Sequence, residues 1–496
     1  MPTAGPPGST GPSRPGPGPD DPAGERPARH WHAELAWLPG VGVRPDVLIE
    51  AAGDRFTAVT PGVPRDAAPA DATALAGLTL PGLANAHSHA FHRGLRGIVQ
   101  AGQGTFWTWR EQMYRLAAAL DPDRYYALAR AVYAEMALAG ITCVGEFHYL
   151  HHGPGGVPYA DPNEMTWALL RAAAEAGLRI TLLDTCYLAA GVDPGGRPRP
   201  LEGAQLRFGD GDAARWADRV AALDVGPHGV LGPGARLGAA IHSVRAVPPD
   251  QMAEVVSWAH QAAAPLHAHL SEQLAENEDA LAAYGRTPAQ VCYEAGALGP
   301  RSTMVHATHL TPDDIELLGE TQTTCCFCPT TEADLADGIG PARALASAGA
   351  PLSLGSDSQA VIDLLAEARW LELSQRLATQ RRVHFTAAEL AGIATSGGHA
   401  CLGWADAGEI TPGSLADLVT VDLDSPRLAG APVEAGAAGT GGTAAVLDRV
   451  VYAATAADVR HVVTGGRDIV RDGRHLLAGD VAADLSASIR ALLAPP

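Results

Sequence analysis

Eight short apolar segments, most of them separated by Ala/Leu-rich helical segments, constrain the fold of this chain more than any other feature. Stretches such as DPDRYYALARAVYAEMALAG and NEMTWALLRAAAEAG repeat apolar residues at helical spacing and end in Gly, a common helix C-cap. This alternation predicts an α/β fold, a (β/α)8 TIM-like barrel. The strand candidates are LTLPGLANAHSH, ITCVGEFHYL, RITLLDTCYL, LGAAIHSVRAV, PLHAHLSEQ, STMVHATHL, TTCCFCPTTE and APLSLGSDS.

Short segments typical of antiparallel strands flank the predicted barrel on both sides. They are WHAELAWL, RPDVLIEAAG and RFTAVTPG before it, and SLADLVTVDLD, AVLDRVVYAA and VRHVVTGGRDIVRDGRH after it. We expect residues 29–79 and 405–496 to form one small β-sandwich domain around a barrel of residues 80–404. Residues 1–28 are rich in Pro and Gly and have little to bury, which predicts a disordered tail.

Charge and hydropathy exclude several classes of partner. The net charge of −20 disfavours nucleic acid and anionic membrane surfaces, which would repel the chain. No segment approaches the roughly 18 apolar residues of a membrane span, and the N-terminus lacks an apolar signal core. We therefore expect a cytoplasmic protein that binds neither nucleic acid nor membrane.

The cysteines and the absence of lysine limit the chemistry further. The seven cysteines are odd in number and scattered, which suits reduced thiols. Cys325, Cys326 and Cys328 form no zinc-finger pattern with a second pair, so we interpret them as buried thiols on a core strand rather than a thiolate metal site. All 35 basic residues are Arg, which excludes a Schiff-base lysine and a carbamylated lysine between two metals.

Histidines and acids occur where the predicted strands end. His87 and His89 follow an apolar run, and alternate residues of a strand share one face, so both imidazoles can bind one ion. Barrel sites assemble at the carboxyl ends of the strands. Besides His87 and His89, the candidates at these ends are His267, His269, Glu272, His306 and Asp357.

A metal site is one interpretation of these residues, and structural alternatives exist for each residue alone. His267 and His306 are compatible with hydrogen-bonded core histidines, Glu272 with a helix N-terminal acid, and Asp357 with a helix N-cap. Taken together, four strand ends with compatible side chains favour an open site of three imidazoles and one carboxylate for Zn²⁺ or Fe²⁺. Its members are His87, His89, His269 and Asp357.

The motifs PGLANAHSH, HLSE and GSD, with a histidine on the sixth strand, resemble the mononuclear branch of the amidohydrolase superfamily, which lacks the bridging lysine. Longer motifs resemble the formimidoylglutamate deiminases of histidine degradation, and GSLADLVTVD resembles the accessory sandwich of the superfamily. The longer motifs are HSHAFHR, FWTWREQMY, GEFHYLHH, IHSVRAV, HLSEQ, VHATHL, CPTTEADLADG and GSDSQ.

The resemblance implies a function and a set of roles. It implies hydrolysis of N-formimino-L-glutamate to N-formyl-L-glutamate and ammonia, with Glu272 as proton shuttle, His306 beside the attacking water and Asp357 as both ligand and proton acceptor. It makes His87, His89, His269 and Asp357 the ligands of one divalent ion per subunit. We expect Zn²⁺, although Fe²⁺ and Mn²⁺ accept the same ligands, and we expect a homodimer.

A dicarboxylate substrate requires permanent cations, which only Arg provides in this chain. The resemblance points to Arg110 and Arg245, and it adds Tyr149 and His242 to the pocket. Arg110 is also compatible with a surface position, and Tyr149 with a core position. Many members of the family have Gln where this chain has His92; we expect His92 to donate a hydrogen bond to the substrate, with a charge that varies with pH.

Two other functions fit parts of the pattern. A deaminase of the same branch that acts on a purine or pterin ring would use aromatic stacking and amide contacts, whereas two arginines favour an acyclic diacid. A non-catalytic scaffold that kept only the barrel is expected to lack ligands, yet all four ligands and both proton-transfer residues are present.

Overall fold

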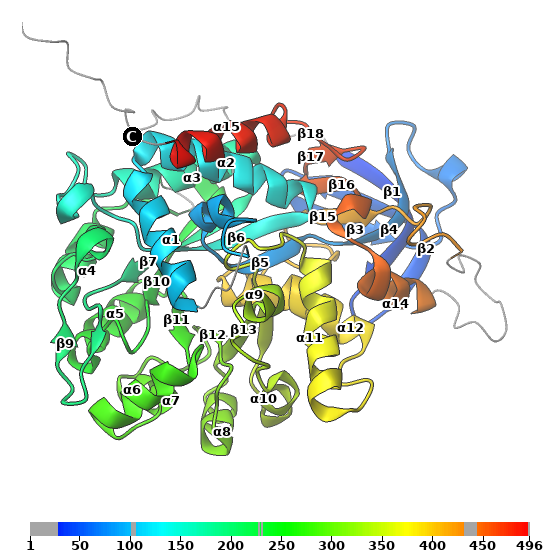
Figure 1. Ribbon diagram of the computed structural model, residues 1–496. Helices are drawn as coiled ribbons and strands as arrows, with labels where there is room; N and C mark the ends of the chain where they lie inside the picture. The colour runs from blue at the N-terminus through cyan, green and yellow to red at the C-terminus, as the bar shows by residue number, and fades with distance from the viewer. Residues whose placement is uncertain (1–27, 101–105, 227–228, 230–231, 431–443, 495–496) are drawn as a thin grey trace, which may run out of the picture.

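The computed structural model describes residues 28–100, 106–226, 229, 232–430 and 444–494. Residues 1–27 of the predicted tail lie outside this part of the chain. A parallel sheet of eight strands confirms the predicted barrel (Figure 1). Its strands in sequence order are β5 (Leu83–Ser88), β6 (Ile141–His148), β7 (Arg179–Cys186), β10 (Ala235–Ile241), β11 (Leu266–Leu270), β12 (Ser302–His306), β13 (Thr324–Phe327) and β14 (Leu352–Leu354).

The first and last strands of the barrel meet at a seam. Each of the other neighbouring pairs forms a parallel ladder. At the seam an isolated parallel bridge joins Ser88 to Asp357. The His89 N–H donates to the Asp357 carbonyl at 3.2 Å, and the Asp357 N–H donates to the His87 carbonyl at 3.0 Å. Closure of the barrel therefore brings together segments that carry three of the four predicted metal ligands.

Helices surround this barrel, as the alternation of the sequence predicts (Figure 1). The helices α3 and α6 end at Gly177 and Gly285, whose left-handed φ values of 80° and 64° are those that glycine adopts without strain. The helices up to the end of the barrel are α1 (Phe106–Ala119), α2 (Pro122–Leu138), α3 (Glu164–Ala176), α4 (Ala213–Ala221), α5 (Pro249–Gln261), α6 (Leu274–Tyr284), α7 (Pro288–Glu294), α8 (Pro312–Glu320), α9 (Pro329–Asp334), α10 (Ala342–Ala348), α11 (Leu364–Thr379), α12 (Ala387–Gly392) and α13 (Gly398–Cys401).

The two ends of the chain together form a second, mixed sheet, as predicted, in the order β18-β17-β16-β15-β4-β1-β2-β3. The strand β15 pairs antiparallel with β4, and β4 pairs parallel with β1. Trp31, Phe56 and Leu418 are buried in one core of this module. The strands are β1 (Arg29–Leu38), β2 (Gly42–Ala52), β3 (Arg55–Thr60), β4 (Thr73–Pro81), β15 (Leu418–Val421), β16 (Val459–Thr464), β17 (Arg467–Arg471) and β18 (Arg474–His475).

Two predicted strands differ in the structure. LTLPGLANAHSH is divided between β4, which belongs to the terminal sheet, and β5, which begins at Leu83 in the barrel. The prediction of a strand at AVLDRVVYAA was wrong: this segment is the helix α14 (Ala444–Ala453). Its buried residues Val446, Leu447 and Val450 follow helical rather than alternating spacing. The last helix, α15 (Val481–Leu493), packs on α2 (Figure 1).

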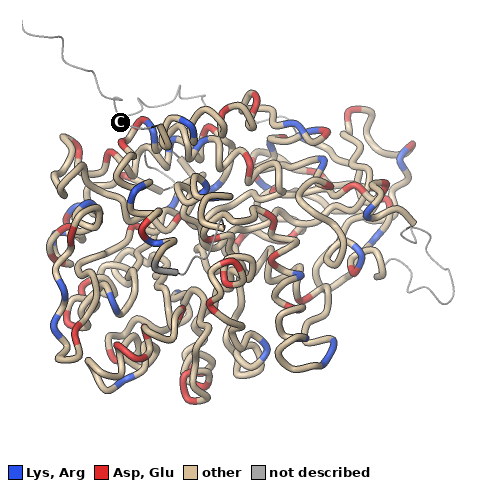
Figure 2. The backbone as a smooth tube through the Cα atoms, in the orientation of Figure 1, with Lys and Arg blue, Asp and Glu red and all other residues tan. Residues whose placement is uncertain are grey.

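The charged residues and the cysteines bear on two predictions from the sequence. Acidic and basic residues are interspersed along the trace (Figure 2). Cys325, Cys326 and Cys328 are free and buried, as predicted, and no metal-capable group found among the described residues contains a cysteine. Among the described helices, none combines the length and the apolar character that crossing a membrane requires.

A buried ion pair joins the barrel to the terminal sheet. Arg179 starts β7, and its Nε donates to the Asp417 carboxylate at 2.8 Å; the two side chains are 5% and 0% exposed. The backbone N–H of Gly465 also donates to Asp417, at 2.6 Å. Asp417 therefore satisfies groups from both modules.

We expect Asp417→Ala to lower the free energy of unfolding by about 3–5 kcal/mol, because it leaves the Arg179 guanidinium buried and unpaired. The control is Glu294→Ala, which breaks the solvent-exposed pair with Arg286 and is expected to leave the free energy of unfolding nearly unchanged. Urea unfolding measures both variants. Equal losses in the two variants would contradict a special role for the interface pair.

Candidate active site

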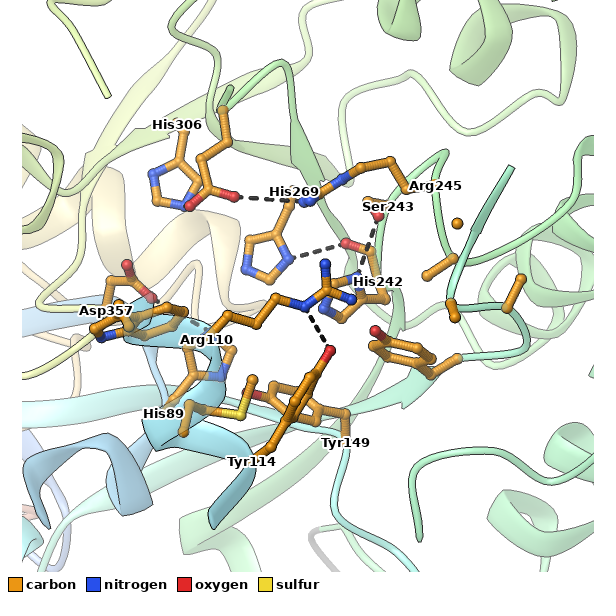
Figure 3. A pocket seen from close by; sticks show the side chains of 18 of the residues that line it. His89, Arg110, Tyr114, Tyr149, His242, Ser243, Arg245, His269, His306 and Asp357 are labelled. Atoms are coloured by element: carbon orange, nitrogen blue, oxygen red, sulfur yellow. Dashed lines mark hydrogen bonds and ion pairs between the residues drawn. The ribbon is translucent and has the colours of Figure 1, made fainter. Parts of the chain in front are cut away.

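A pocket opens at the carboxyl ends of the barrel strands, where the sequence predicted the site (Figure 3). The structure brings the predicted residues together around it. Most of them line the pocket directly; the exceptions are His87 and His267. The predicted residues that line the pocket are His89, His92, Arg110, Tyr149, His242, Arg245, His269, Glu272, His306 and Asp357.

The four predicted metal ligands converge on one point. The Asp357 Oδ1 atom lies 3.2 Å from His87 Nε2 and 3.3 Å from His89 Nε2, and the Nε2 atoms of His87 and His269 are 3.2 Å apart. Atoms bound tetrahedrally to one ion at about 2.1 Å lie about 3.4 Å from one another. The observed spacings therefore fit a single divalent ion.

Backbone carbonyl groups orient two of these imidazoles. The Nδ1 atom of His89 donates to the Phe147 carbonyl at 2.8 Å, and that of His269 donates to the His242 carbonyl at 2.9 Å. A proton fixed on Nδ1 leaves the lone pair on Nε2, which faces the other ligands. The local fold thus selects the tautomer that a metal ion needs.

Burial and hydrogen bonding set the charges that such a site requires. Burial lowers the pKa of His87, His89 and His269, so these imidazoles stay neutral. Burial opposes ionisation of Asp357, but the hydrogen bond with His87 holds the pKa of its carboxyl well below its usual range. The result is three neutral nitrogen donors and one carboxylate.

Glu272 and His306 lie next to each other beside this cluster. His306 Nε2 is 3.9 Å from Glu272 Oε1, and His306 Nδ1 is 3.4 Å from Glu332 Oε1. Burial opposes protonation of His306, yet the charges of Glu272, Glu332 and Asp357 raise its pKa well above the usual value. His306 can therefore present positive charge to a reacting group.

Two arginines come from different sides of the pocket (Figure 3). Arg110 lies on α1, and its Nε donates to the Tyr114 hydroxyl at 2.5 Å. Arg245 follows β10 and is close to two carboxylates, Glu272 at 3.5 Å and Glu276 at 3.6 Å. A bound carboxylate would therefore meet a guanidinium that is already oriented.

The prediction that the charge of His92 varies with pH was wrong. Burial lowers the pKa of His92 to about 3, so the ring stays neutral at physiological pH. Its Nε2 atom lies 2.9 Å from the Tyr149 hydroxyl. The sequence could not show this burial, because His92 follows a strand in a segment that reads as an exposed loop.

Several residues of the site were absent from the sequence prediction. Glu276 follows Glu272 by one helical turn, a spacing that could have indicated it. Glu332 lies within the quoted motif CPTTEADLADG. Arg199 lies on a short hairpin, β8 (Gly191–Val192) and β9 (Pro198–Arg199), whose sequence signals only a turn. The other unpredicted lining residues with polar groups include Tyr114, Tyr187 and Ser243.

His267 and a second cluster of histidines have structural rather than catalytic surroundings. His267, a predicted candidate, lies below the pocket, where its Nε2 donates to the Cys401 carbonyl at 3.1 Å. His148, His151 and Asp184 form a separate cluster with metal-capable spacing. Arg219 donates to both Asp184 oxygens at 2.8 and 3.0 Å, so that carboxylate already neutralises a buried cation.

Comparison with known proteins agrees with this architecture. The model of the Amidohydrolase family matches residues 78–469. A formimidoylglutamate deiminase of Pseudomonas aeruginosa is 38% identical over 89% of this chain and 95% of its own length. An 8-oxoguanine deaminase of the same species is 31% identical over 71% of this chain and 76% of its own length.

Solved structures also resemble this chain over most of its length. An amidohydrolase from Brucella melitensis superposes with a TM-score of 0.82 and 32% identity, over 94% of this chain and 100% of that chain. An adenosine deaminase from Xanthomonas campestris with bound zinc superposes with a TM-score of 0.75 and 25% identity, over 93% of this chain and 97% of that chain. The barrel and the terminal sheet are thus shared across most of both chains.

The burial of His267 predicts a pH dependence of stability. Burial lowers its pKa to about 3, whereas an unfolded histidine titrates near pH 6.5. Below about pH 6.5 the unfolded state therefore binds a proton that the native state does not, which lowers the free energy of unfolding by about 1.4 kcal/mol per pH unit for this residue. We expect His267→Gln to show a shallower loss of stability between about pH 6.5 and 4.5.

Urea unfolding at several pH values measures this slope. The matched control is His260→Gln on α5, because the His260 side chain is exposed, and this variant should keep the slope of the unmodified protein. Parallel curves for His267→Gln and the unmodified protein would contradict the prediction.

Proposed function

The chain belongs to the amidohydrolase family, a family of metal-dependent C–N hydrolases, and we propose that it converts N-formimino-L-glutamate to N-formyl-L-glutamate and ammonia. One observation carries the choice of substrate: Arg110 and Arg245 enter the pocket that contains the convergent ligands. Two guanidinium groups suit a substrate with two carboxylates. The 38% identity with the formimidoylglutamate deiminase supports the same choice.

The positions of the lining residues are compatible with such a substrate. Its amidine group has to reach the ligand cluster while its carboxylates remain near the arginines. Arg245 lies beside the ligand His269, and His89 and Tyr149 lie on the side of Arg110 (Figure 3). Neutral His92 and His242 add polar groups without adding charge, because burial lowers the pKa of both.

The residues that would hold the metal ion are His87, His89, His269 and Asp357, whose spacing fits one divalent ion. We propose Zn²⁺, with Fe²⁺ and Mn²⁺ compatible with the same donors. The bound ion supplies Lewis acidity, which lowers the pKa of water towards about 7. By the resemblance stated above, we further propose a cytoplasmic homodimer that acts in histidine degradation.

Different side chains carry out the separate proton transfers of the reaction. As the water oxygen adds to the amidine carbon, Asp357, which is ionised in this environment, accepts a water proton. Glu272 carries protons to the terminal nitrogen, and His306 stabilises the negative charge that develops on the oxygen. The C–N bond then breaks, the nitrogen leaves as ammonia, and the carbon keeps a new carbonyl oxygen.

A purine or pterin substrate is the second candidate, because Trp109, Tyr149 and Tyr187 line the same pocket. Aromatic rings can stack on a heterocycle. The relative named 8-oxoguanine deaminase also belongs to this comparison. Neither arginine would have a carboxylate partner on such a ring, which favours the diacid.

Measurement of ammonia release tests the proposal directly. We expect release from N-formimino-L-glutamate and none from guanine, 8-oxoguanine or adenosine. Arg110→Leu should raise KM by about 10- to 100-fold, because it removes a charged partner of one carboxylate. The control is Arg115→Leu, an exposed arginine on the same helix, which should leave KM unchanged. Activity on a purine alone would contradict the proposal.

The role of Glu272 gives a separate prediction. Glu272→Gln keeps the shape of the side chain but cannot carry a proton, so kcat should fall by about 10²- to 10⁴-fold with little change in KM. Steady-state kinetics measures both constants. Glu278→Gln, an exposed position on α6, provides the control. A normal kcat for Glu272→Gln would exclude Glu272 as the proton shuttle.

A further inference from the structure

A buried polar network lies at the barrel seam behind the predicted metal ligands. Its side chains come from β5, from β6 and from the loop after β14, and none of the five residues exposes any surface. Polar groups at this depth are costly unless each finds a partner. The five residues are Asn85, Ser88, Glu146, Ser356 and Gln359.

The hydrogen bonds of this network run in one direction. Asn85 Nδ2 donates to Ser356 Oγ at 2.7 Å, and Ser356 Oγ donates to Gln359 Oε1 at 2.8 Å. Gln359 Nε2 donates to Ser88 Oγ at 2.8 Å, and Ser88 Oγ donates to Glu146 Oε2 at 2.8 Å. The other oxygen of Glu146 accepts from the Ala90 N–H at 2.7 Å.

This direction requires an amide at position 359. The side chain has to accept from Ser356 at one atom and donate to Ser88 at the other, and an amide does both at once. A carboxylate would place an acceptor against the Ser88 hydroxyl, whose proton is already directed to Glu146. An apolar side chain would remove the acceptor of the Ser356 hydroxyl and the donor to the Ser88 hydroxyl. Ser356 would then keep its contact with Asn85, and Ser88 its bond to Glu146.

The network connects the segments that hold the predicted ligands. Ser88 lies between His87 and His89, so its side chain points away from the pocket while theirs point toward the ligand cluster. Ser356 and Gln359 flank Asp357 on the other side of the seam. Asp357 and Gln359 have left-handed φ values of 41° and 60°, which non-glycine residues adopt only where surrounding contacts hold them.

We propose that Gln359 is a positioning residue, which fixes Asp357 relative to His87 and His89 across the seam and so sets the geometry of the metal site before an ion binds. This inference rests on the metal site of the proposed function. Without the Gln359 amide, the loop after β14 keeps its backbone contacts at the bridge and its contacts with Asn85. It loses its side-chain connection to Ser88, the residue between the two histidines of the first strand. The Asp357 carboxylate is then held less firmly at the distances from His87 and His89 that one ion requires.

Metal affinity tests this proposal apart from catalysis. The principal variant is Gln359→Met, which keeps the approximate volume and removes both hydrogen bonds. After removal of the metal, Zn²⁺ affinity is measured by competition with a chelator, and the absorption spectrum of the Co²⁺-loaded protein reports the ligand geometry. We expect Zn²⁺ binding about 10- to 100-fold weaker than in the unmodified protein, with a changed Co²⁺ spectrum.

Thr331→Val is the matched control. The Thr331 hydroxyl is buried and contacts the same loop, at the Ser358 hydroxyl (3.2 Å) and the Ser356 carbonyl (3.3 Å). In the described chain, none of its hydrogen bonds reaches β5. We expect this variant to bind Zn²⁺ normally. Thermal melting of the metal-free proteins shows whether each variant is folded, and if Gln359→Met is not, Ser88→Ala interrupts the same network with a smaller change.

The outcomes separate this proposal from the proposed function. If the unmodified protein binds no divalent ion, the metal site itself is wrong, and the inference fails with it. If the unmodified protein binds Zn²⁺ and both network variants bind it within about twofold with unchanged Co²⁺ spectra, positioning by Gln359 is overturned. An equal loss of affinity in Thr331→Val would also overturn it, because the effect would then be general to the loop.

Discussion

The closure of the barrel between its first and last strands is the constraint on which the site depends. Asp357 lies 3.2–3.3 Å from the imidazoles of His87 and His89, and His87 lies 3.2 Å from His269; such crowding of lone pairs is unfavourable without a cation. The first strand supplies two imidazoles, and the loop after the last strand supplies the carboxylate. The two meet at a single bridge, so the packing around the seam decides whether the donors converge.

Two parts of the site differ in the charge that they favour on a histidine ring. Around the ligands, burial keeps the imidazoles neutral, and around His306 the carboxylates of Glu272 and Glu332 favour the charged ring. Arg245 extends the charged part, because it contacts Glu272 as well as Glu276. A carboxylate bound at Arg245 would compete with Glu272 for the guanidinium. In the proposed function, substrate binding would then change the surroundings of the predicted proton shuttle.

The periodicity of strands and helices made part of the site predictable from the sequence. His87 and His89 share a face because alternate residues of a strand do, and Asp357 and His269 lie near them because parallel strands end at one rim. AVLDRVVYAA was misassigned since a short apolar run does not distinguish a strand from a helix. The burial of His92 and the network of Gln359 depend on tertiary contacts; Gln359 lies 271 positions from Ser88.

Geometry alone leaves two ways to choose the ligands, since His306 is also within metal-binding distance of His87, His269 and Asp357. The hydrogen bonds distinguish them. The Nδ1 atoms of His89 and His269 donate to backbone carbonyls, which leaves neutral Nε2 atoms for a metal. His306 instead directs Nδ1 to the Glu332 carboxylate and Nε2 towards Glu272, an environment that favours the protonated ring. Carboxylates near both ring nitrogens of His306 favour a role in stabilising charge, and His89 stays the predicted fourth ligand.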